Sequence, residues 1–256
     1  MTHKTLNTTL AAAALMATGL ATAHAVDTDN QVRLGFSGRK DIANGVRLDV
    51  ATEQRFFNDV SNYYYSEFDL GFNIKVNDWL SIAPTLRFKE ERSLAMVDGK
   101  KLDNTSERYY RNEGQGVLGR WTRETRPMLN ATLQHTFDSK WKLENRNRFE
   151  WRQYASDTSD WKRFRNRTKV TSPWKLGGDL KINPYATVEL FQPLSGRTGG
   201  KPRTARQDYE AALGVSAEIA KDLSLDLYYM AEFREQSNNS LRHTANILGL
   251  AAQYKF

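Results

Sequence analysis

The stretch Phe68-Asp69-Leu70-Gly71-Phe72-Asn73-Ile74-Lys75-Val76 decides the fold class, because apolar and polar residues alternate along it without a break. A period of two is the pattern of a β-strand that has one apolar and one polar face. The same alternation returns in residues 80–88 and 223–233. Asn77-Asp78 separates the first two stretches and is a two-residue turn signal, so these stretches are predicted to form a hairpin.

Extending the alternation along the chain predicts about ten strands. Their ranges are 45–57, 63–76, 79–91, 126–137, 141–154, 161–172, 179–191, 206–220, 223–235 and 242–256. Each is at least twelve residues long, whereas strands of soluble proteins most often have about 5–6 residues. The tilted strands of a transmembrane barrel need this greater length.

The predicted connections also alternate in length. Tight turns fall at 77–78, 138–140 and 220–222, and long loops fall near 92–125 and 192–205. Short turns at one end and long loops at the other are typical of a transmembrane antiparallel β-barrel. Twelve strands is the alternative count, if residues 32–36 and part of the first long loop join the wall. The prediction is therefore an all-β outer-membrane barrel over residues 45–256.

The N-terminal residues have the pattern of a cleaved signal peptide. Lys4 supplies a short positive region, residues 8–20 are uncharged and mostly apolar, and Ala23-His24-Ala25 resembles a cleavage site. Residues 1–25 are thus expected to be removed on export. Residues 26–44 are expected to form an N-terminal periplasmic or plugging segment, because bacterial single-chain barrels have even strand numbers.

Composition narrows the class of protein further. The 256 residues contain no cysteine, carry a formal net charge of +7 and are 39% hydrophobic. Neither a disulfide framework nor a cysteine metal site is available. A helical membrane protein is excluded, because it needs spans of about 20 apolar residues. Nucleic acid is not expected as a partner, since acidic residues are interleaved with the basic ones.

The last strand carries a possible assembly signal. Leu248, Leu250, Ala252, Tyr254 and Phe256 share one face, and the chain ends in an aromatic residue. This ending resembles the C-terminal signal of bacterial outer-membrane barrels, which implies that the barrel assembly machinery binds Tyr254 and Phe256. The bacterial outer membrane is therefore the expected location, and its lipid the expected surroundings.

Two neighbouring predicted strands carry a ladder of basic residues at a spacing of two. Burial of one such charge on the lipid face costs about 2–4 kcal/mol at mid-bilayer, so the ladder is predicted to line the lumen. The proposed anion path consists of Arg146, Arg148, Arg152, Arg163, Arg165, Arg167 and Lys169, and the expected acidic partners are Glu144, Glu150 and Glu189.

The ladder supports two interpretations. Rings of Arg and Lys are a basis of anion selectivity, so the barrel can be a narrow channel that prefers small anionic solutes. Alternatively, the acids pair with the arginines and close the lumen, since small barrels are often filled by side chains. A closed structural or adhesive barrel, acting through its external loops, is then the second hypothesis.

An outer-membrane enzyme is the third hypothesis and has little support. His135 and His243 are the histidines that follow the predicted signal peptide, and neither has a convincing serine or acidic partner. We therefore predict no catalytic residue, no metal site and no cofactor.

Three stretches resemble a known family. Residues 145–152 (Asn-Arg-Asn-Arg-Phe-Glu-Trp-Arg), 163–167 (Arg-Phe-Arg-Asn-Arg) and 188–191 (Val-Glu-Leu-Phe) are similar to an uncharacterised bacterial family of outer-membrane barrels, a domain of unknown function. The resemblance covers most of residues 31–256 and implies the barrel but no activity. The arginine tracks are also similar in character to those of oligogalacturonate-type porins.

Overall fold

The computed structural model describes residues 29–57, 62–94, 118–155, 161–175, 181–195, 197–198, 201–202, 207–235 and 241–256. The predicted signal peptide lies outside these residues. Among the residues described, no helix is long and apolar enough to cross a membrane.

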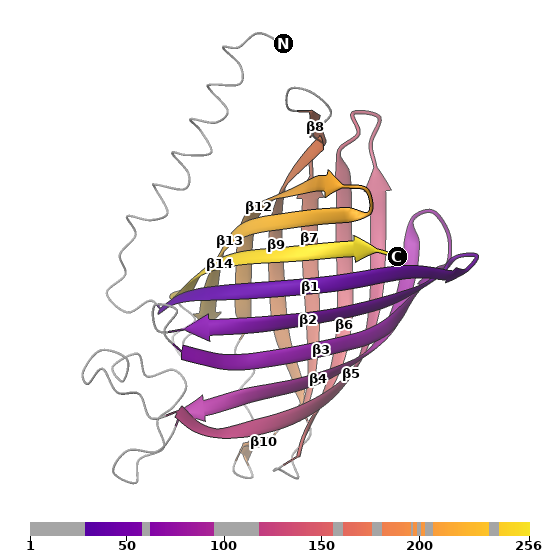
Figure 1. Cartoon of the computed structure of the whole chain (residues 1–256). Coiled ribbons are helices and arrows are strands. Elements are labelled where there is room, and N and C mark those ends of the chain that lie inside the picture. The colour runs from indigo at the N-terminus through magenta and orange to yellow at the C-terminus, as the bar shows by residue number, and fades with distance from the viewer. Residues whose placement is uncertain are drawn as a thin grey trace.

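Eleven long strands form the wall of a closed barrel (Figure 1). They are β1 (Asp29–Ala43), β2 (Val46–Phe57), β3 (Asn62–Lys75), β4 (Leu80–Leu94), β5 (Leu118–Thr136), β6 (Lys142–Tyr154), β7 (Trp161–Thr171), β9 (Lys181–Ser195), β12 (Asp208–Ala220), β13 (Leu223–Glu235) and β14 (Leu241–Lys255). Each strand pairs with its neighbour along the chain in antiparallel fashion, with β9 pairing both β7 and β12. Three two-residue strands complete the list: β8 (Trp174–Lys175) extends one edge beside β9, and β10 (Arg197–Thr198) pairs with β11 (Lys201–Pro202).

The barrel closes through β1, which corrects two sequence-based predictions. β1 pairs with β2 in antiparallel fashion and with β14 in parallel, with Asp29 opposite Ala245 and Arg39 opposite Lys255. The strand count is therefore eleven and not ten, and residues 29–43 belong to the wall instead of forming a plug. With an odd count the first and last strands run the same way, so only a parallel pairing can close the ring.

The predicted long loops are shorter than expected. β4 continues to Leu94 and β5 begins at Leu118, so both ends of the range 92–125 are strand. β9 likewise continues to Ser195, inside the range 192–205. Residues 95–117, at the centre of the first loop, lie outside the described part of the chain.

One end of the barrel, called here the turn end, carries the short connections and the C-terminus (Figure 1). The connections there include Asn44-Gly45, with Gly45 at φ 72°, and Lys221-Asp222, with Asp222 at φ 63°. In the turn after β3, Lys75 Nζ lies 2.6 Å from Asp78 Oδ1. This ion pair lowers the pKa of the exposed Asp78 carboxyl.

The alternation of the sequence becomes an inside-out distribution of polarity. On β3 the apolar side chains face outward, and Phe68 remains 46% exposed. The most buried side chains include charged ones, with Glu150 at 0% and Arg126 at 2% exposed. An apolar exterior around a polar interior is the arrangement of a barrel that spans a bilayer.

Gly71 allows β3 and β4 to approach closely. A Cβ atom at this position would lie 2.8 Å from the backbone oxygen of Pro84 and 3.1 Å from the Cα of Thr85. We expect Gly71→Ala to destabilise the barrel by about 1–3 kcal/mol, because backbone must shift to relieve the overlap. Urea-induced unfolding in lipid vesicles would measure this, with Gly35→Ala as the comparison. A Cβ at Gly35 would lie 3.2 Å from the Ala251 side chain and no nearer than 3.8 Å to any backbone atom. Equal stability of the two variants would contradict the prediction.

Candidate functional site: the charged lumen

The structure brings the predicted basic ladder together across the β6–β7 hairpin. Arg146 lies opposite Arg167, Arg148 opposite Arg165, and Glu150 opposite Arg163. These positions share one parity on both strands, and the same face carries Arg152, Lys169 and Glu144. Like charges directly opposite each other are destabilising in a sheet. Acids from other positions must therefore compensate for them.

Glu150 is the centre of this compensation. Its Oε2 lies 2.6 Å from Arg163 Nη2 and 3.3 Å from Arg126 Nη1. Its Oε1 lies 3.2 Å from Arg165 Nη1 and 3.7 Å from Arg148 Nη1. One fully buried carboxylate thus holds four guanidinium groups from β5, β6 and β7.

Two further acids extend the network to neighbouring strands. Glu124 on β5 accepts a bidentate pair from Arg152, at 2.6 Å from Nε and 2.7 Å from Nη2, and also accepts from Arg126 Nε at 2.8 Å. Glu189 on β9 accepts from Arg165 Nε at 2.9 Å and from Arg146 Nη2 at 3.1 Å. The three acids therefore link the lumen faces of β5, β6, β7 and β9.

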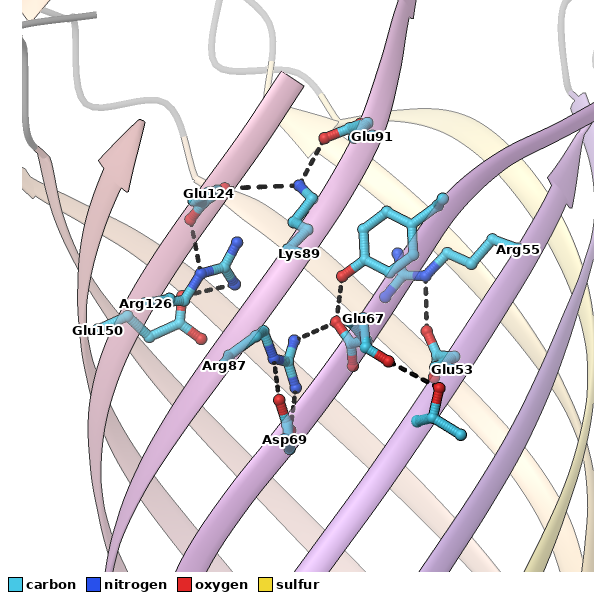
Figure 2. Close-up of polar contacts among 12 residues, drawn as sticks. Glu53, Arg55, Glu67, Asp69, Arg87, Lys89, Glu91, Glu124, Arg126 and Glu150 are labelled. Atoms are coloured by element: carbon cyan, nitrogen blue, oxygen red, sulfur yellow. Dashed lines mark hydrogen bonds and ion pairs between the residues drawn. The ribbon is translucent and has the colours of Figure 1, made fainter. Parts of the chain in front are cut away.

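A second group of ion pairs lies on the β2–β4 side (Figure 2). Arg87 on β4 points between two acids of β3, at 2.5 Å from Glu67 Oε2 and 2.6 Å from Asp69 Oδ2. The Tyr65 hydroxyl donates a hydrogen bond to Glu67. On β2, Arg55 Nε lies 2.6 Å from Glu53 Oε1.

β1 contributes to the same lumen. Arg33 is 5% exposed and forms ion pairs with Glu232 on β13 and, at 3.5 Å, with Glu210 on β12. These contacts cross the parallel seam between β1 and β14. The charged network therefore surrounds the lumen and is not confined to the two strands that the sequence indicated.

Each of the six predicted arginines has a carboxylate oxygen within 4.0 Å. Arg167 completes the set through Glu144, at 3.3 Å. Lys169 differs, because its Nζ lies 3.7 Å from the centre of the Tyr185 ring. The predicted acidic partners Glu144, Glu150 and Glu189 all take part in these pairs.

Sequence reasoning missed Glu124 and Arg126. Their side chains are among the most deeply buried charged groups of the described lumen. Both lie in or beside the range that we assigned to a loop. Outward-facing Arg123 is 76% exposed, so no apolar stripe marks the start of β5. The sequence marked the start of β5 only on its inner face, which is mostly polar. Residues 122, 124, 126, 128 and 130 on that face are Thr, Glu, Arg, Met and Asn.

Three cavities lie along the lumen. An outer cavity of about 430 Å³ lies away from the turn end, an inner cavity of about 830 Å³ lies at the turn end, and a middle cavity of about 350 Å³ lies between them. The outer and middle cavities share the side chains of Arg33, Arg55, Arg87, Arg165 and Glu210. The middle and inner cavities share Ser37, Ala51, Asp69, Arg146 and Arg148. Arginines thus make up four of the five residues shared at the first boundary and two of the five shared at the second.

All three cavities have an excess of basic side chains. The outer cavity is lined by ten basic and four acidic residues, the middle cavity by eight and six, and the inner cavity by six and four. The side chains that line each cavity therefore carry a net positive formal charge. In the described part of the chain, no cluster of three or more His, Asp or Glu side chains is arranged to hold a metal ion.

A closed all-β barrel with an apolar exterior and a charged interior is an outer-membrane-type β-barrel. The fold is similar to the β domain of the Bordetella autotransporter BrkA, with a TM-score of 0.50 and 14% identity over 79% of this chain and 81% of that one. The siderophore receptor PirA from Pseudomonas aeruginosa has a TM-score of 0.35 at 7% identity, over 80% of this chain and 34% of the receptor. OmpT, an outer membrane protein of Vibrio cholerae, has a TM-score of 0.33 at 9% identity, over 85% of this chain and 91% of that one.

The chain belongs to the family DUF2490, described as a protein of unknown function, which matches residues 30–243. The predicted resemblance to an uncharacterised barrel family is thereby confirmed. No curated protein sequence matches the chain.

Proposed function

We propose that this chain is a bacterial outer-membrane barrel that acts as a narrow, anion-preferring channel. The observation that carries the proposal is the series of three adjoining cavities along the lumen, separated by arginine side chains and lined by an excess of basic residues. Small anionic solutes are the proposed cargo, since guanidinium groups bind carboxylates and phosphates well.

The arginines between the cavities have a double role in this proposal. Arg146 and Arg148 line both the middle and the inner cavity, so they narrow the path and supply its charge. Their acidic partners, Glu189 and Glu150, hold them in place. The acids thus position the arginines without neutralising the cavities as a whole.

A closed barrel is the second candidate, because every arginine of the predicted path is ion-paired. In that case the network acts as internal bracing, and the function resides in the segments that connect the strands at the end opposite the turn end. We propose no enzymatic activity for either form.

Outer-membrane lipid and the barrel assembly machinery are the proposed partners. The proposed assembly signal lies at the turn end, where the Tyr254 and Phe256 rings stack with their centres 6.3 Å apart. The Phe256 backbone N–H donates to the Arg39 carbonyl at 2.9 Å, and the Phe256 side chain is 52% exposed. This accessible pair of rings beside the β1–β14 seam supports recognition of the C-terminal strand.

Single-channel recording in a planar bilayer under a KCl gradient tests the channel. We expect discrete conductance steps and a reversal potential with the sign of chloride preference. Correct folding is established separately by heat-modifiable migration on gels, and a heat-unfolded sample serves as the control for leak. A heat-modifiable barrel that conducts nothing, or that prefers potassium, would refute the proposal and favour the closed barrel.

A further inference from the structure

A small group of hydrogen-bonding side chains lies on the outer surface of the β6–β7 hairpin. The group consists of Asn145 and Asn147 on β6 and Asn166 and Thr168 on β7, and is called here the amide cluster. Asn147 lies opposite Asn166 and Asn145 opposite Thr168, at the parity opposite to that of the lumen arginines. These four polar residues therefore face away from the lumen.

Apolar residues surround the amide cluster on all four sides. Along the hairpin, the next outward pairs are Leu143 with Val170 toward the turn end and Phe149 with Phe164 in the other direction. Across the sheet, the neighbouring positions on β5 are Ala131 and Leu133, and those on β9 are Val188 and Leu190. The cluster is thus a polar island within the outer apolar surface.

The cluster lies near the middle of the proposed membrane span. Trp141 immediately precedes β6 and Trp151 lies on its outer face; they are 46% and 42% exposed. Both occupy positions suited to the two interfacial girdles. Ten residues at about 3.3 Å each, tilted by about 40°, span roughly 25 Å, which equals the height of the apolar band of such barrels. Asn145 and Asn147 fall on either side of the midpoint between the tryptophans.

The cluster satisfies only part of its own hydrogen-bonding capacity. Asn166 Nδ2 donates to Asn147 Oδ1 at 2.8 Å and to Asn145 Oδ1 at 3.2 Å, and Asn145 Nδ2 donates to Thr168 Oγ1 at 3.0 Å. Asn147 Nδ2 donates to Asn145 Oδ1 at 2.8 Å. Within the described part of the chain, the second amide hydrogen of Asn147 and the hydroxyl hydrogen of Thr168 have no acceptor. Hydrocarbon offers none, and an unsatisfied polar group there is costly.

We infer that the amide cluster is the centre of an interface with a second copy of this chain. This inference rests on the membrane placement in the proposed function, but not on channel activity. Amide groups both donate and accept, so a cluster of them is complementary to its own copy. A two-fold axis along the membrane normal brings the same patch of both barrels together, as in most homodimers. Side-chain amides stabilise association in lipid in this way.

The absence of cysteine from the chain allows a direct test by disulfide formation. We expect Asn147→Cys, refolded into lipid vesicles and oxidised, to give a covalent dimer. The matched control is Leu227→Cys on β13, which also faces outward, is 55% exposed and lies at a similar distance from its turn. We expect little dimer from the control. Absence of dimer from Asn147→Cys, or equal dimer from both variants, would overturn the inference.

A second experiment needs no introduced thiol. The unmodified protein in detergent micelles is expected to sediment as a dimer, and the triple variant Asn145→Leu, Asn147→Leu and Asn166→Leu as a monomer. Leucine suits the lipid-facing surface, so the variant should keep its heat-modifiable migration. A monomeric unmodified barrel, or a dimer that persists in the triple variant, would count against the cluster.

Resistance to urea extraction from vesicles reports membrane insertion separately. A protein that is not inserted would therefore be distinguished from an inserted barrel that does not dimerise.

Discussion

Replacement of Glu150 by glutamine is expected to destabilise the barrel by about 3–5 kcal/mol, because it leaves buried guanidinium groups without their counter-charge. Glutamine keeps the shape of the side chain and removes only the charge. Arg163 lies 2.6 Å from this carboxylate and has it as its ion-pair partner among the described residues. Arg165 and Arg126 retain Glu189 and Glu124. The loss therefore centres on Arg163 and on Arg148, whose ion pair is also with Glu150.

Urea-induced unfolding in lipid vesicles would measure this loss. The matched control is Glu90→Gln, which breaks the pair between Glu90 and Arg123, 47% and 76% exposed. An exposed pair contributes about 0–1 kcal/mol, so this variant should remain close to the unmodified protein. If Glu150→Gln cost as little as Glu90→Gln, the lumen arginines would have to be solvated by water and not held by Glu150.

The double variant Arg146→Ala and Arg148→Ala is expected to raise the single-channel conductance several-fold and to bring the chloride preference close to unity. Both side chains separate the middle from the inner cavity. Two unit charges 4 Å apart interact by about 1 kcal/mol in water and about 4 kcal/mol near a protein surface, so each lost cation changes anion occupancy substantially.

The network should survive this double variant. Glu189 keeps Arg165 at 2.9 Å, and Glu150 keeps Arg163 at 2.6 Å. The control is Arg47→Ala, which removes one charge from the wall of the inner cavity and leaves the boundary intact. Reversal potentials and conductance would be recorded for all three proteins. An unchanged current in the double variant would show that ions do not pass these arginines.

The alternation of the sequence predicted most of the wall because each strand has one environment on each face. Residues 68–75 and 223–233 have clean alternation, and both ranges lie in strands of the barrel. The lumen-facing parity of Arg146 and Arg165 followed from the same rule, since lipid tolerates charge poorly. These features depend on local sequence alone.

β1 could not be predicted in the same way. Its outward positions change from Leu34 and Phe36 to Gly38 and Lys40, so the alternation is lost halfway along the strand. Its pairing with β14 joins residues more than two hundred positions apart, and no turn connects them. The preference for an even number of strands then excluded the eleventh strand from the prediction.

The ion-pair partners of the lumen residues likewise could not be predicted from the sequence. Glu150 was expected to pair with an arginine, but register and strand tilt decide that Arg126, from β5, reaches it as well. The amide cluster had no signal of its own either, because Asn147 and Asn166 lie between the arginines that dominate these segments. Such assignments require the positions of neighbouring strands.

Because β1 and β14 are parallel, the first residue of β1 and the last residue of the chain lie at opposite ends of the barrel. Asp29 lies level with Ala245, whereas Phe256 lies beyond Arg39, eleven positions further along the seam. A circular permutant of this barrel would therefore need a linker that covers roughly 35 Å along the strands, at about 3.3 Å per residue. In an even-stranded barrel both ends lie on one rim, and a short linker suffices. Peptide tags fused at the two ends of this wall would likewise be accessible from opposite sides of the membrane.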